Sequence, residues 1–197
     1  MRLHKADVVL DCTDNMATRQ EINATCVALN TPLITASAVG FGGQLMVLTP
    51  PWEQGCYRCL WPDNQEPERN CRTAGVVGPV VGVMGTLQAL EAIKLLSGIE
   101  TPAGELRLFD GKSSQWRSLT LRRANGCPVC GGCNADPDQP MQCVAGLTVH
   151  ELLKQLDQQQ AGAALAINQQ IVPREQWAQH IVQDGDQILL FQVIAGG

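Results

Sequence analysis

Short apolar runs and one stretch of helical spacing alternate over the first fifty residues. Residues 6–12 form an apolar run of strand length, and residues 17–29 repeat apolar positions three and four apart, which predicts a helix. Two β-rich runs follow at residues 33–39 and 45–48. This order of strand, helix and strand predicts an α/β layer.

The glycine-rich segment Gly40-Phe-Gly-Gly43 lies between two of these predicted strands. A phosphate-binding loop would be followed by a helix, because the helix N-terminus faces the anion. The residues after Gly43 have strand character instead, so we interpret the segment as a hairpin turn.

Residues 50–75 are polar and contain several prolines, which predicts a loop. A helix is expected to begin near Pro79, a residue suited to a first helical turn, and to run to Leu96, with Gly98 ending it. The uncharged stretch at residues 73–90 contains one proline and four glycines. It therefore favours a buried, glycine-rich helix over a membrane span.

Two further strands, at residues 106–109 and 118–121, are expected to pair as a hairpin that closes the first domain. Residues 134–140 hold two Asp and two Pro and no aliphatic side chain larger than alanine, which is typical of a linker. We therefore expect a first domain over residues 1–133 and a second over residues 141–197.

The second domain has the pattern of a small α+β fold. A short strand at residues 141–144 precedes a helix that begins at Thr148, where Thr148 and Glu151 fit a capping box. Strand-like runs follow at residues 164–167 and 187–193.

Charge is divided unevenly between the two expected domains. Residues 1–133 hold 12 Lys/Arg and 12 Asp/Glu, whereas residues 134–197 hold 2 and 7, so the second part carries the whole net charge of −5. No basic stripe indicates nucleic-acid binding, and an acidic domain is suited to docking on a more basic protein surface. The first residues lack an apolar signal core, so we expect a cytoplasmic protein.

Nine cysteines without a secretion signal are expected to be metal ligands or reactive thiols rather than disulfides. Cys56-x-x-Cys59 and Cys127-x-x-Cys130 are two pairs, each able to offer two thiolates to one tetrahedral ion. Four sulfur ligands leave no position for water, so the pairs predict a structural zinc site. Independent free thiols are the alternative, because only the fold can bring the two pairs together.

Cys71 stands apart from these pairs, between Arg69 and Arg72 and shortly before the helix expected at Pro79. Neighbouring positive charge and a helix N-terminus favour thiolate over thiol. The residue is therefore either a reactive thiol or an incidental cysteine.

The segment Asp11-Cys-Thr-Asp-Asn15 follows the first predicted strand, at the position where open α/β sheets bind ligands. Asp14 could hold a magnesium ion that bridges nucleotide phosphates, because carboxylate oxygens suit that ion. Alternatively, Asp14 or Asn15 caps the following helix. The residues alone leave both interpretations open.

The chain ends in Gly196-Gly197, immediately after an apolar strand. A tail without side chains can thread a narrow channel and present its carboxylate to a reaction centre. A terminal diglycine on a small α+β domain is typical of ubiquitin-like carriers, and a frayed end is the alternative.

Together these residues resemble two known families. Residues 6–132 resemble the C-terminal two-thirds of ThiF, the sulfur-carrier adenylyltransferase of thiamine biosynthesis, which is related to MoeB and the ubiquitin-activating enzymes. Residues 141–197 resemble the β-grasp carrier ThiS, most specifically through residues 187–197. The motifs that carry the first resemblance are Asp11-Cys-Thr-Asp-Asn15 with Arg19, Cys56-x-x-Cys59, Cys71-Arg-Thr-Ala-Gly75 and Cys127-x-x-Cys130. The resemblance implies an incomplete Rossmann-like domain with a four-cysteine zinc knuckle, followed by a ubiquitin-like β-grasp domain.

The resemblance also implies a reaction. A carrier's terminal carboxylate, here that of Gly197, attacks the α-phosphate of Mg-ATP. Sulfur from a cysteine desulfurase then displaces AMP and leaves a thiocarboxylate for thiazole synthase. Asp14 matches the family's magnesium-binding and catalytic aspartate, with Asn15 beside it in the nucleotide site. Cys71 matches the cysteine that can link to the carrier's terminal carbonyl.

Two departures from the family pattern shape the expectations. The family's glycine-rich nucleotide loop precedes the strand at Val8, so we expect this chain alone to bind Mg-ATP weakly, or another chain to supply the loop. Residues 134–140 cannot supply the apolar strand with which the carrier fold opens.

Three functions therefore compete. The chain is an adenylyltransferase with its own carrier, or a carrier whose first domain is a zinc-held docking module, or a MoaD-like sulfur carrier for molybdopterin. Expected partners are a sulfur carrier or complete adenylyltransferase, the desulfurase and the synthase, with a homodimer implied by the family.

Overall fold

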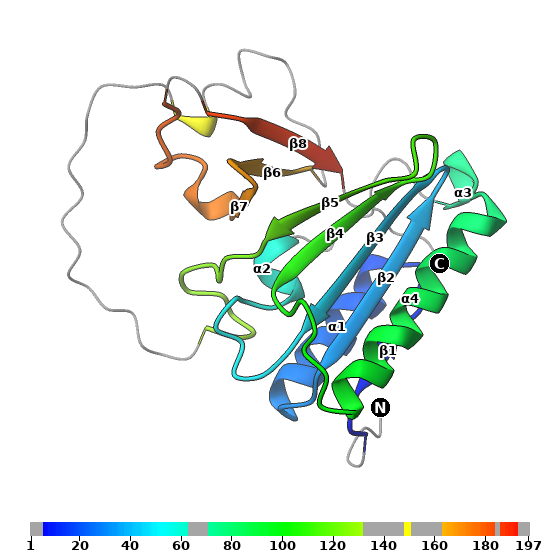
Figure 1. Cartoon of the computed structure of the whole chain (residues 1–197). Coiled ribbons are helices and arrows are strands. Elements are labelled where there is room, and N and C mark those ends of the chain that lie inside the picture. Colours follow the sequence, from blue (N-terminus) through cyan, green and yellow to red (C-terminus); the bar gives the residue numbers. More distant parts are fainter. Residues whose placement is uncertain (1–5, 63–70, 132–147, 151–162, 184–185, 193–197) are drawn as a thin grey trace.

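The computed structural model describes residues 6–62, 71–131, 148–150, 163–183 and 186–192, in which one mixed sheet carries helices on both faces (Figure 1). The strands are β1 (Val9–Asp11), β2 (Leu33–Val39), β3 (Gly42–Leu48), β4 (Glu105–Asp110), β5 (Gln115–Thr120), β6 (Ala163–Ile167), β7 (Gln170–Val172) and β8 (Ile188–Gln192). The helices are α1 (Met16–Ala28), α2 (Tyr57–Leu60), α3 (Cys71–Ala74), α4 (Gly78–Leu96) and the 3-10 helix η1 (Arg174–Gln176).

The first five strands form the sheet of the expected first domain. β1 pairs with β2 in parallel, and β2, β3, β4 and β5 follow as antiparallel neighbours. α4 covers one face of this sheet and α1 lies on the other (Figure 1). All seven residues of β2 are buried because the sheet is covered on both sides. The predicted strand, helix and strand order and the predicted closing hairpin are confirmed.

The glycine-rich segment after β2 is a hairpin turn, as predicted. Gly40 and Phe41 form a two-residue connection, with Val39 opposite Gly42 across the antiparallel pair. Gly40 has a φ of +58°, a conformation that favours glycine. At Gly43 an added Cβ would lie 2.5 Å from the sulfur of Met84, so this glycine lets α4 approach the sheet closely.

α4 agrees with the predicted helix in its bounds but not in its burial. Its buried face contacts the sheet through Val80, Met84, Gln88, Glu91 and Ala92. Its opposite face leaves Ile93 61% and Leu96 59% exposed. The expectation of a buried helix is therefore correct for one face and wrong for the other. α4 is also the one described helix whose length and composition would allow a membrane span.

The loop predicted at residues 50–75 contains two short helices, α2 and α3, so the prediction is wrong at these positions. Neither helix has a sequence with helical period. α2 is held by a tertiary contact instead, since the side chain of Asn23 accepts a hydrogen bond from the Tyr57 main-chain nitrogen at 3.0 Å. Residues 63–70 lie outside the described ranges.

The second part of the chain contributes an antiparallel set of strands in the order β7-β6-β8. β6 and β8 confirm the two predicted runs, and β7 is an addition. The turn before β7 contains no glycine: Asn168 and Gln169 have φ values of 50° and 67°, a two-residue hairpin that the sequence pattern does not reveal. Val149, Leu165, Ile167, Val172 and Trp177 form one buried cluster within this part.

Several expectations for this part lie outside the described residues. They concern the linker at residues 134–140, the strand at residues 141–144, the helix beyond residue 150, and the terminal diglycine. The described residues 149–150 are helical, which agrees with a helix that begins at Thr148. The boundary between the two domains stays a prediction.

The two parts of the chain share one eight-stranded sheet in the order β1-β2-β3-β4-β5-β7-β6-β8. The link between them is a parallel bridge of one residue pair, Thr120 of β5 and Gln170 of β7. Their buried residues also merge, because Ala164, Ala166 and Ile171 belong to the same cluster as residues of the first part.

Candidate functional site

The two cysteine pairs meet inside the molecule, although 67 residues separate them in the sequence. The Sγ atoms of Cys56 and Cys127 are 3.9 Å apart, and those of Cys59 and Cys130 are 3.4 Å apart. All four sulfurs lie within 4.8 Å of one another, and all four residues are buried. The fold therefore brings the two pairs together, as a shared metal site requires, and the zinc ion itself stays a prediction.

Local contacts shape this four-cysteine cluster. Asn23 of α1 donates from its side-chain amide to the sulfur of Cys56 at 3.5 Å. Gly55 has a φ of +100°, and an added Cβ there would lie 3.1 Å from the sulfur of Cys59. Beside the second cysteine pair, Arg123 donates to the carbonyl oxygen of Cys130. Both cysteine pairs are thus fixed to the first domain.

The geometry of the cluster fits a tetrahedral metal ion. Metal–sulfur bonds of about 2.3 Å require sulfurs about 3.8 Å apart, close to the two distances above. Hydrogen bonding from Cys130 lowers the pKa of Cys127 far below its usual range, and Cys127 raises the pKa values of Cys59 and Cys130 far above theirs. The four thiols therefore influence one another's ionisation, and an ion that binds here would displace the protons that they hold.

At the carboxyl end of β1 a buried ion pair organises the segment that contains Asp14. Arg19 of α1 donates to the carboxylate of Asp11 at 3.1 Å and to the hydroxyl of Thr35 at 2.8 Å. The same guanidinium donates to the carbonyl oxygens of Ala36, at 3.1 Å, and of Thr13. One side chain thus ties together the end of β1, the middle of β2 and the turn that follows β1.

The structure separates the two interpretations of Asp14 and Asn15. Asn15 is the N-cap of α1, because its side-chain oxygen accepts a hydrogen bond from the Thr18 main-chain nitrogen at 2.9 Å. Asp14 is exposed, and its carboxylate accepts a hydrogen bond from the Asn15 amide at 3.5 Å. The capping role belongs to Asn15, and the carboxylate of Asp14 stays exposed beside it.

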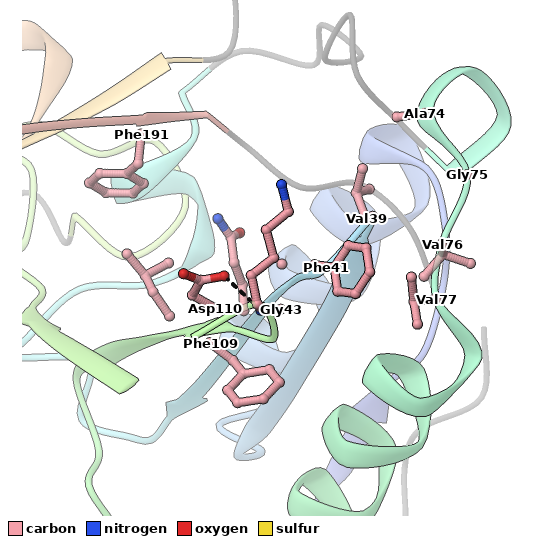
Figure 2. Close-up of a pocket in the computed structure, with 15 residues that line it drawn as sticks. Val39, Phe41, Gly43, Ala74, Gly75, Val76, Val77, Phe109, Asp110 and Phe191 are labelled. Carbon is pink, nitrogen blue, oxygen red and sulfur yellow. Dashed lines mark hydrogen bonds between the residues drawn. The ribbon is translucent and has the colours of Figure 1, made fainter. Parts of the chain in front are cut away.

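A cavity of about 850 Å³ lies at the carboxyl end of β2. Figure 2 shows Phe191 of β8 on one side of it and Phe41, Val76 and Val77 on the other. Most of its lining is apolar, with Asp110 among its polar residues. Segments from both parts of the chain therefore form this cavity, at the edge of the sheet to which the β1 end also belongs.

Two charged residues of the β4–β5 turn contribute to the cavity lining. Asp110 accepts a hydrogen bond from the Ser113 hydroxyl at 2.7 Å. It also accepts one from the Lys112 main-chain nitrogen at 3.0 Å (Figure 2). The first of these, with help from the second, lowers the pKa of Asp110. Lys112 places its ammonium group 5.8 Å from the centre of the Phe41 ring. The sequence did not predict a role for Asp110, Lys112 or Ser113, since their only signal was a turn between two strands.

The other predicted site residues are placed less fully. Cys71 is the first residue of α3, whose last residue, Ala74, lines the cavity together with Gly75. The side chain of Cys71 and the whole of Gly197 lie outside the described residues. Gln192, which ends β8, is five residues from the C-terminus.

Comparison with known families divides the chain in two. The ThiF family model matches residues 2–129, and the ThiS family model matches residues 137–197. Among solved structures, E. coli MccB matches with a TM-score of 0.54 at 20% identity, covering 70% of this chain and 42% of MccB. That similarity shows a shared fold.

Individual relatives are much more similar. Over 133 residues, 68% of this chain, the protein is 96% identical to the sulfur carrier protein ThiS adenylyltransferase of Escherichia coli (strain K12) and spans 53% of it. Over 60 residues, 30% of this chain, it is 92% identical to the sulfur carrier protein ThiS of the same strain and spans 91% of it. The molybdopterin-synthase adenylyltransferase of that strain is 45% identical over 126 residues, 64% of this chain and 51% of that protein. The chain thus spans about half the length of the adenylyltransferases it matches.

Proposed function

Because the chain belongs to the ThiF family over residues 2–129 and contains a ThiS-family module over residues 137–197, we propose that it takes part in ATP-dependent sulfur transfer for thiamine biosynthesis. The observation that carries the proposal is the presence of both modules, 96% and 92% identical to an adenylyltransferase and its carrier, in one folded chain. The reaction activates the carboxylate of Gly197, and the product is a C-terminal thiocarboxylate.

In this reaction Gly197 is the nucleophile. One oxygen of its carboxylate bonds to the α-phosphorus of ATP as pyrophosphate leaves. The terminal sulfur of a desulfurase persulfide then displaces AMP and forms an acyl disulfide. A thiol reductant cleaves its S–S bond, which releases the thiocarboxylate and leaves the reductant in a disulfide with the desulfurase cysteine. The exposed carboxylate of Asp14 is the group suited to hold the magnesium of Mg-ATP, which neutralises phosphate charge during attack. Asn15 supports this role from the N-cap of α1 by ordering the neighbouring turn.

The cavity beside Phe191 is suited to receive the tail that ends in Gly197. Five residues follow β8, and an extended chain of that length reaches about 16 Å. Its first residues, Val193, Ile194 and Ala195, match the apolar lining, and the two glycines have no side chains to obstruct a narrow passage. The tail of the second module therefore starts at the rim of the cavity.

Cys71 acts in this proposal as the thiol that links to the carrier's terminal carbonyl. Two features support the role. α3 begins at Cys71, and the residues that follow α3 line the cavity. Cys71 thus lies within one helical turn of the wall along which the tail would pass.

The four-cysteine cluster holds a structural zinc ion. Thiolate ligands in tetrahedral arrangement suit zinc, and with four sulfurs bound no position remains for water or substrate. Its role is to hold α2 and residues 124–131 together, beneath the second module.

Thiamine is favoured over molybdopterin as the pathway by the difference between 96% and 45% identity to the two E. coli adenylyltransferases. In the competing proposal the chain is a carrier that another adenylyltransferase activates, and sulfur is added to the same Gly197 carboxylate. The desulfurase and thiazole synthase are the partners that this chemistry requires in the cytoplasm.

A second copy of the chain is the partner that suits the exposed face of α4. Leu90, Ile93, Leu96 and Ile99 are 46–61% exposed there, which is unusual for neighbouring large aliphatic side chains. The two charged residues of α4, Glu91 and Lys94, form an ion pair at 3.0 Å, so two such faces can meet about a two-fold axis without net repulsion. This is the homodimer that the family resemblance implies.

Intact-mass spectrometry tests the proposed function. The chain is incubated with Mg-ATP, cysteine and a desulfurase, with or without the E. coli ThiS adenylyltransferase, and loading is read at the end point. A gain of about 16 Da marks replacement of oxygen by sulfur. A gain without the added enzyme supports an active adenylyltransferase, and a gain only with it supports the carrier. No gain in either sample contradicts both.

A further inference from the structure

Both faces of the second module's sheet are buried, one against the module's own core and the other against the first domain. On β6, Leu165 and Ile167 belong to the module's own core, whereas Ala164 and Ala166 belong to the core of the first domain. The side chains that point toward the first domain form one surface, here named the docking face: Ala164, Ala166, Ile171, Leu189 and Phe191. The register confirms that they share a side, with Ala164 opposite Phe191 and Ala166 opposite Leu189.

The first domain meets the docking face with an apolar surface, here named the receiving surface: Trp61, Leu119 and Leu121. Trp61 is 2% exposed, and its ring contacts that of Phe191 edge-on with centres 6.1 Å apart. Gln20 of α1 donates to the Trp61 carbonyl oxygen at 2.6 Å and so holds the main chain of Trp61 against α1. The anchor of the receiving surface thus belongs to the segment that follows the first cysteine pair.

A polar edge completes the contact and sets its register. The Thr120 main-chain nitrogen donates to the carbonyl oxygen of Gln169 at 3.0 Å, next to the bridge between Thr120 and Gln170. Arg122 donates to the side chain of Gln170. Main-chain pairing at a sheet edge, combined with an aromatic residue in an apolar surface, is a recognised way for one protein to bind another.

We propose that the receiving surface is the one on which the first domain accepts a sulfur carrier, and that the chain's own second module occupies it and excludes a free carrier. This inference rests on the proposed function. Its occupant is residues 163–192 of the same chain, whose docking face is already buried there. A tethered module is present at an effective concentration in the millimolar range, so a free carrier should bind roughly 100-fold more weakly than to an open surface.

Binding of the docking face to the receiving surface also places the chain's own tail, rather than that of a free carrier, at the cavity. Phe191 contacts Trp61 and at the same time lines the 850 Å³ cavity. When the docking face is bound, the end of β8 is therefore at the cavity rim. A free carrier would need both positions, and the fused module holds both.

Calorimetric titration with the free E. coli ThiS relative, in the absence of ATP, tests the inference on the full chain. Ala166→Arg places a charge in the docking face, at a residue that is 1% exposed, and should open the receiving surface. We expect ThiS to bind this variant about 100-fold more tightly than the unaltered chain. Because Ala166 does not belong to the second module's own core, amide exchange at Leu165 and Val172 should stay slow.

Two further variants keep the result interpretable. Phe191→Glu opens the contact from the opposite strand and should increase ThiS binding as well, even if Ala166→Arg perturbs β6. Ala178→Arg is the matched control, because it adds the same charge to an exposed position of the acidic second module. It should bind ThiS as weakly as the unaltered chain.

Equal binding to all chains, or binding to none, would overturn the inference, as would tighter binding to the Ala178→Arg control. These outcomes are separate from failure of the proposed function. A chain that gains sulfur at Gly197 but binds free ThiS without any opening mutation loses the inference and keeps its function. A chain that never gains sulfur loses the function, whatever the titration shows.

Discussion

Arg19 and Asp11 form an ion pair of 3.1 Å between α1 and β1, and each side chain is only 1% exposed. Gln88 of α4 approaches the same strand end from the opposite face and donates to the carbonyl oxygens of Asp11 and Ile34, both at 2.8 Å. Helices on both faces thus fix the end of β1, from which the segment bearing Asp14 emerges.

Replacing Arg19 by Gln should therefore destabilise the first domain strongly. The change leaves the Asp11 carboxylate buried without its charged partner, which typically costs about 3–5 kcal/mol. Urea denaturation followed by circular dichroism measures the loss. Arg117→Gln, at an exposed position of β5, is the control and should shift stability by less than about 0.5 kcal/mol. Similar effects of both changes would show that the buried pair has no special role.

The purified chain should contain about one zinc ion, and Cys56→Ser or Cys127→Ser should release it. Loss of the ion removes folding free energy, so the region around α2 should also become sensitive to protease. Elemental analysis of reduced protein that has not met a chelator provides the measurement. Cys12→Ser is the control, because Cys12 is exposed and lies outside the four-cysteine cluster. Metal-free protein with four intact cysteines would contradict the assignment.

How far the sequence predicts the fold depends on the range of the interactions involved. β2 and α4 have clear local signals, an apolar run and a proline in the first helical turn, and both match their predicted bounds closely. Three other features have no clear local signal. α2 depends on a hydrogen bond to the distant Asn23, and β7 follows a turn without glycine. The exposed face of α4 depends on which surfaces the rest of the chain covers.

The site divides along the same line. Motifs identify the four cysteines, because the residue types themselves indicate the chemistry. The cavity escapes sequence reasoning, since Phe41, Asp110 and Phe191 come from three separate turns or strands and meet only in the folded chain.

Stability should fall at alkaline pH because of Cys26. Burial, and to a lesser degree the charge of Asp11, raises the pKa of Cys26 from 9.0 to about 11. The folded state therefore holds this proton more tightly than the unfolded state. The resulting stabilisation is complete below pH 9 and is lost as the pH rises toward 11. Urea midpoints at pH 8, 9, 10 and 11 should decline less steeply for Cys26→Ala, and parallel declines would exclude Cys26 as the cause.

Ile93→Glu should weaken self-association of the chain. Ile93 is 61% exposed on the apolar face of α4, and a carboxylate there would repel its symmetry mate in a two-fold contact. Sedimentation velocity over a range of concentrations should show a dimer for the unaltered chain and a monomer for the variant. Ala24→Glu, at an exposed position of α1 on the other side of the sheet, should leave the dimer intact. A monomeric unaltered chain would rule out the homodimer.

Deletion of Gly197, or Gly196→Val, should abolish thiocarboxylate formation. The deletion moves the reacting carboxylate back by one residue, about 3.5 Å, and valine adds a branched side chain where a narrow passage accepts only glycine. Both positions lie beyond β8, so the described fold should not change, and circular dichroism spectra should coincide. Intact-mass spectrometry after incubation with Mg-ATP, cysteine, a desulfurase and the E. coli ThiS adenylyltransferase gives the reading.

The matched control for these tail variants is Gln179→Ala, an exposed change in the same module that leaves the tail untouched. It should load sulfur as fully as the unaltered chain, which must itself first be shown to gain about 16 Da. If the chain lacking Gly197 also gains about 16 Da, the prediction is wrong. A gain of about 32 Da marks sulfur added to a thiol instead, and the exposed Cys12 is then the first position to examine as a persulfide. A persulfide is removed by reductant whereas a thiocarboxylate survives it, so treatment with dithiothreitol before the measurement separates the two. Loss of the mass gain only in the tail variants, with resistance to reductant in the others, places the reaction at the Gly197 carboxylate.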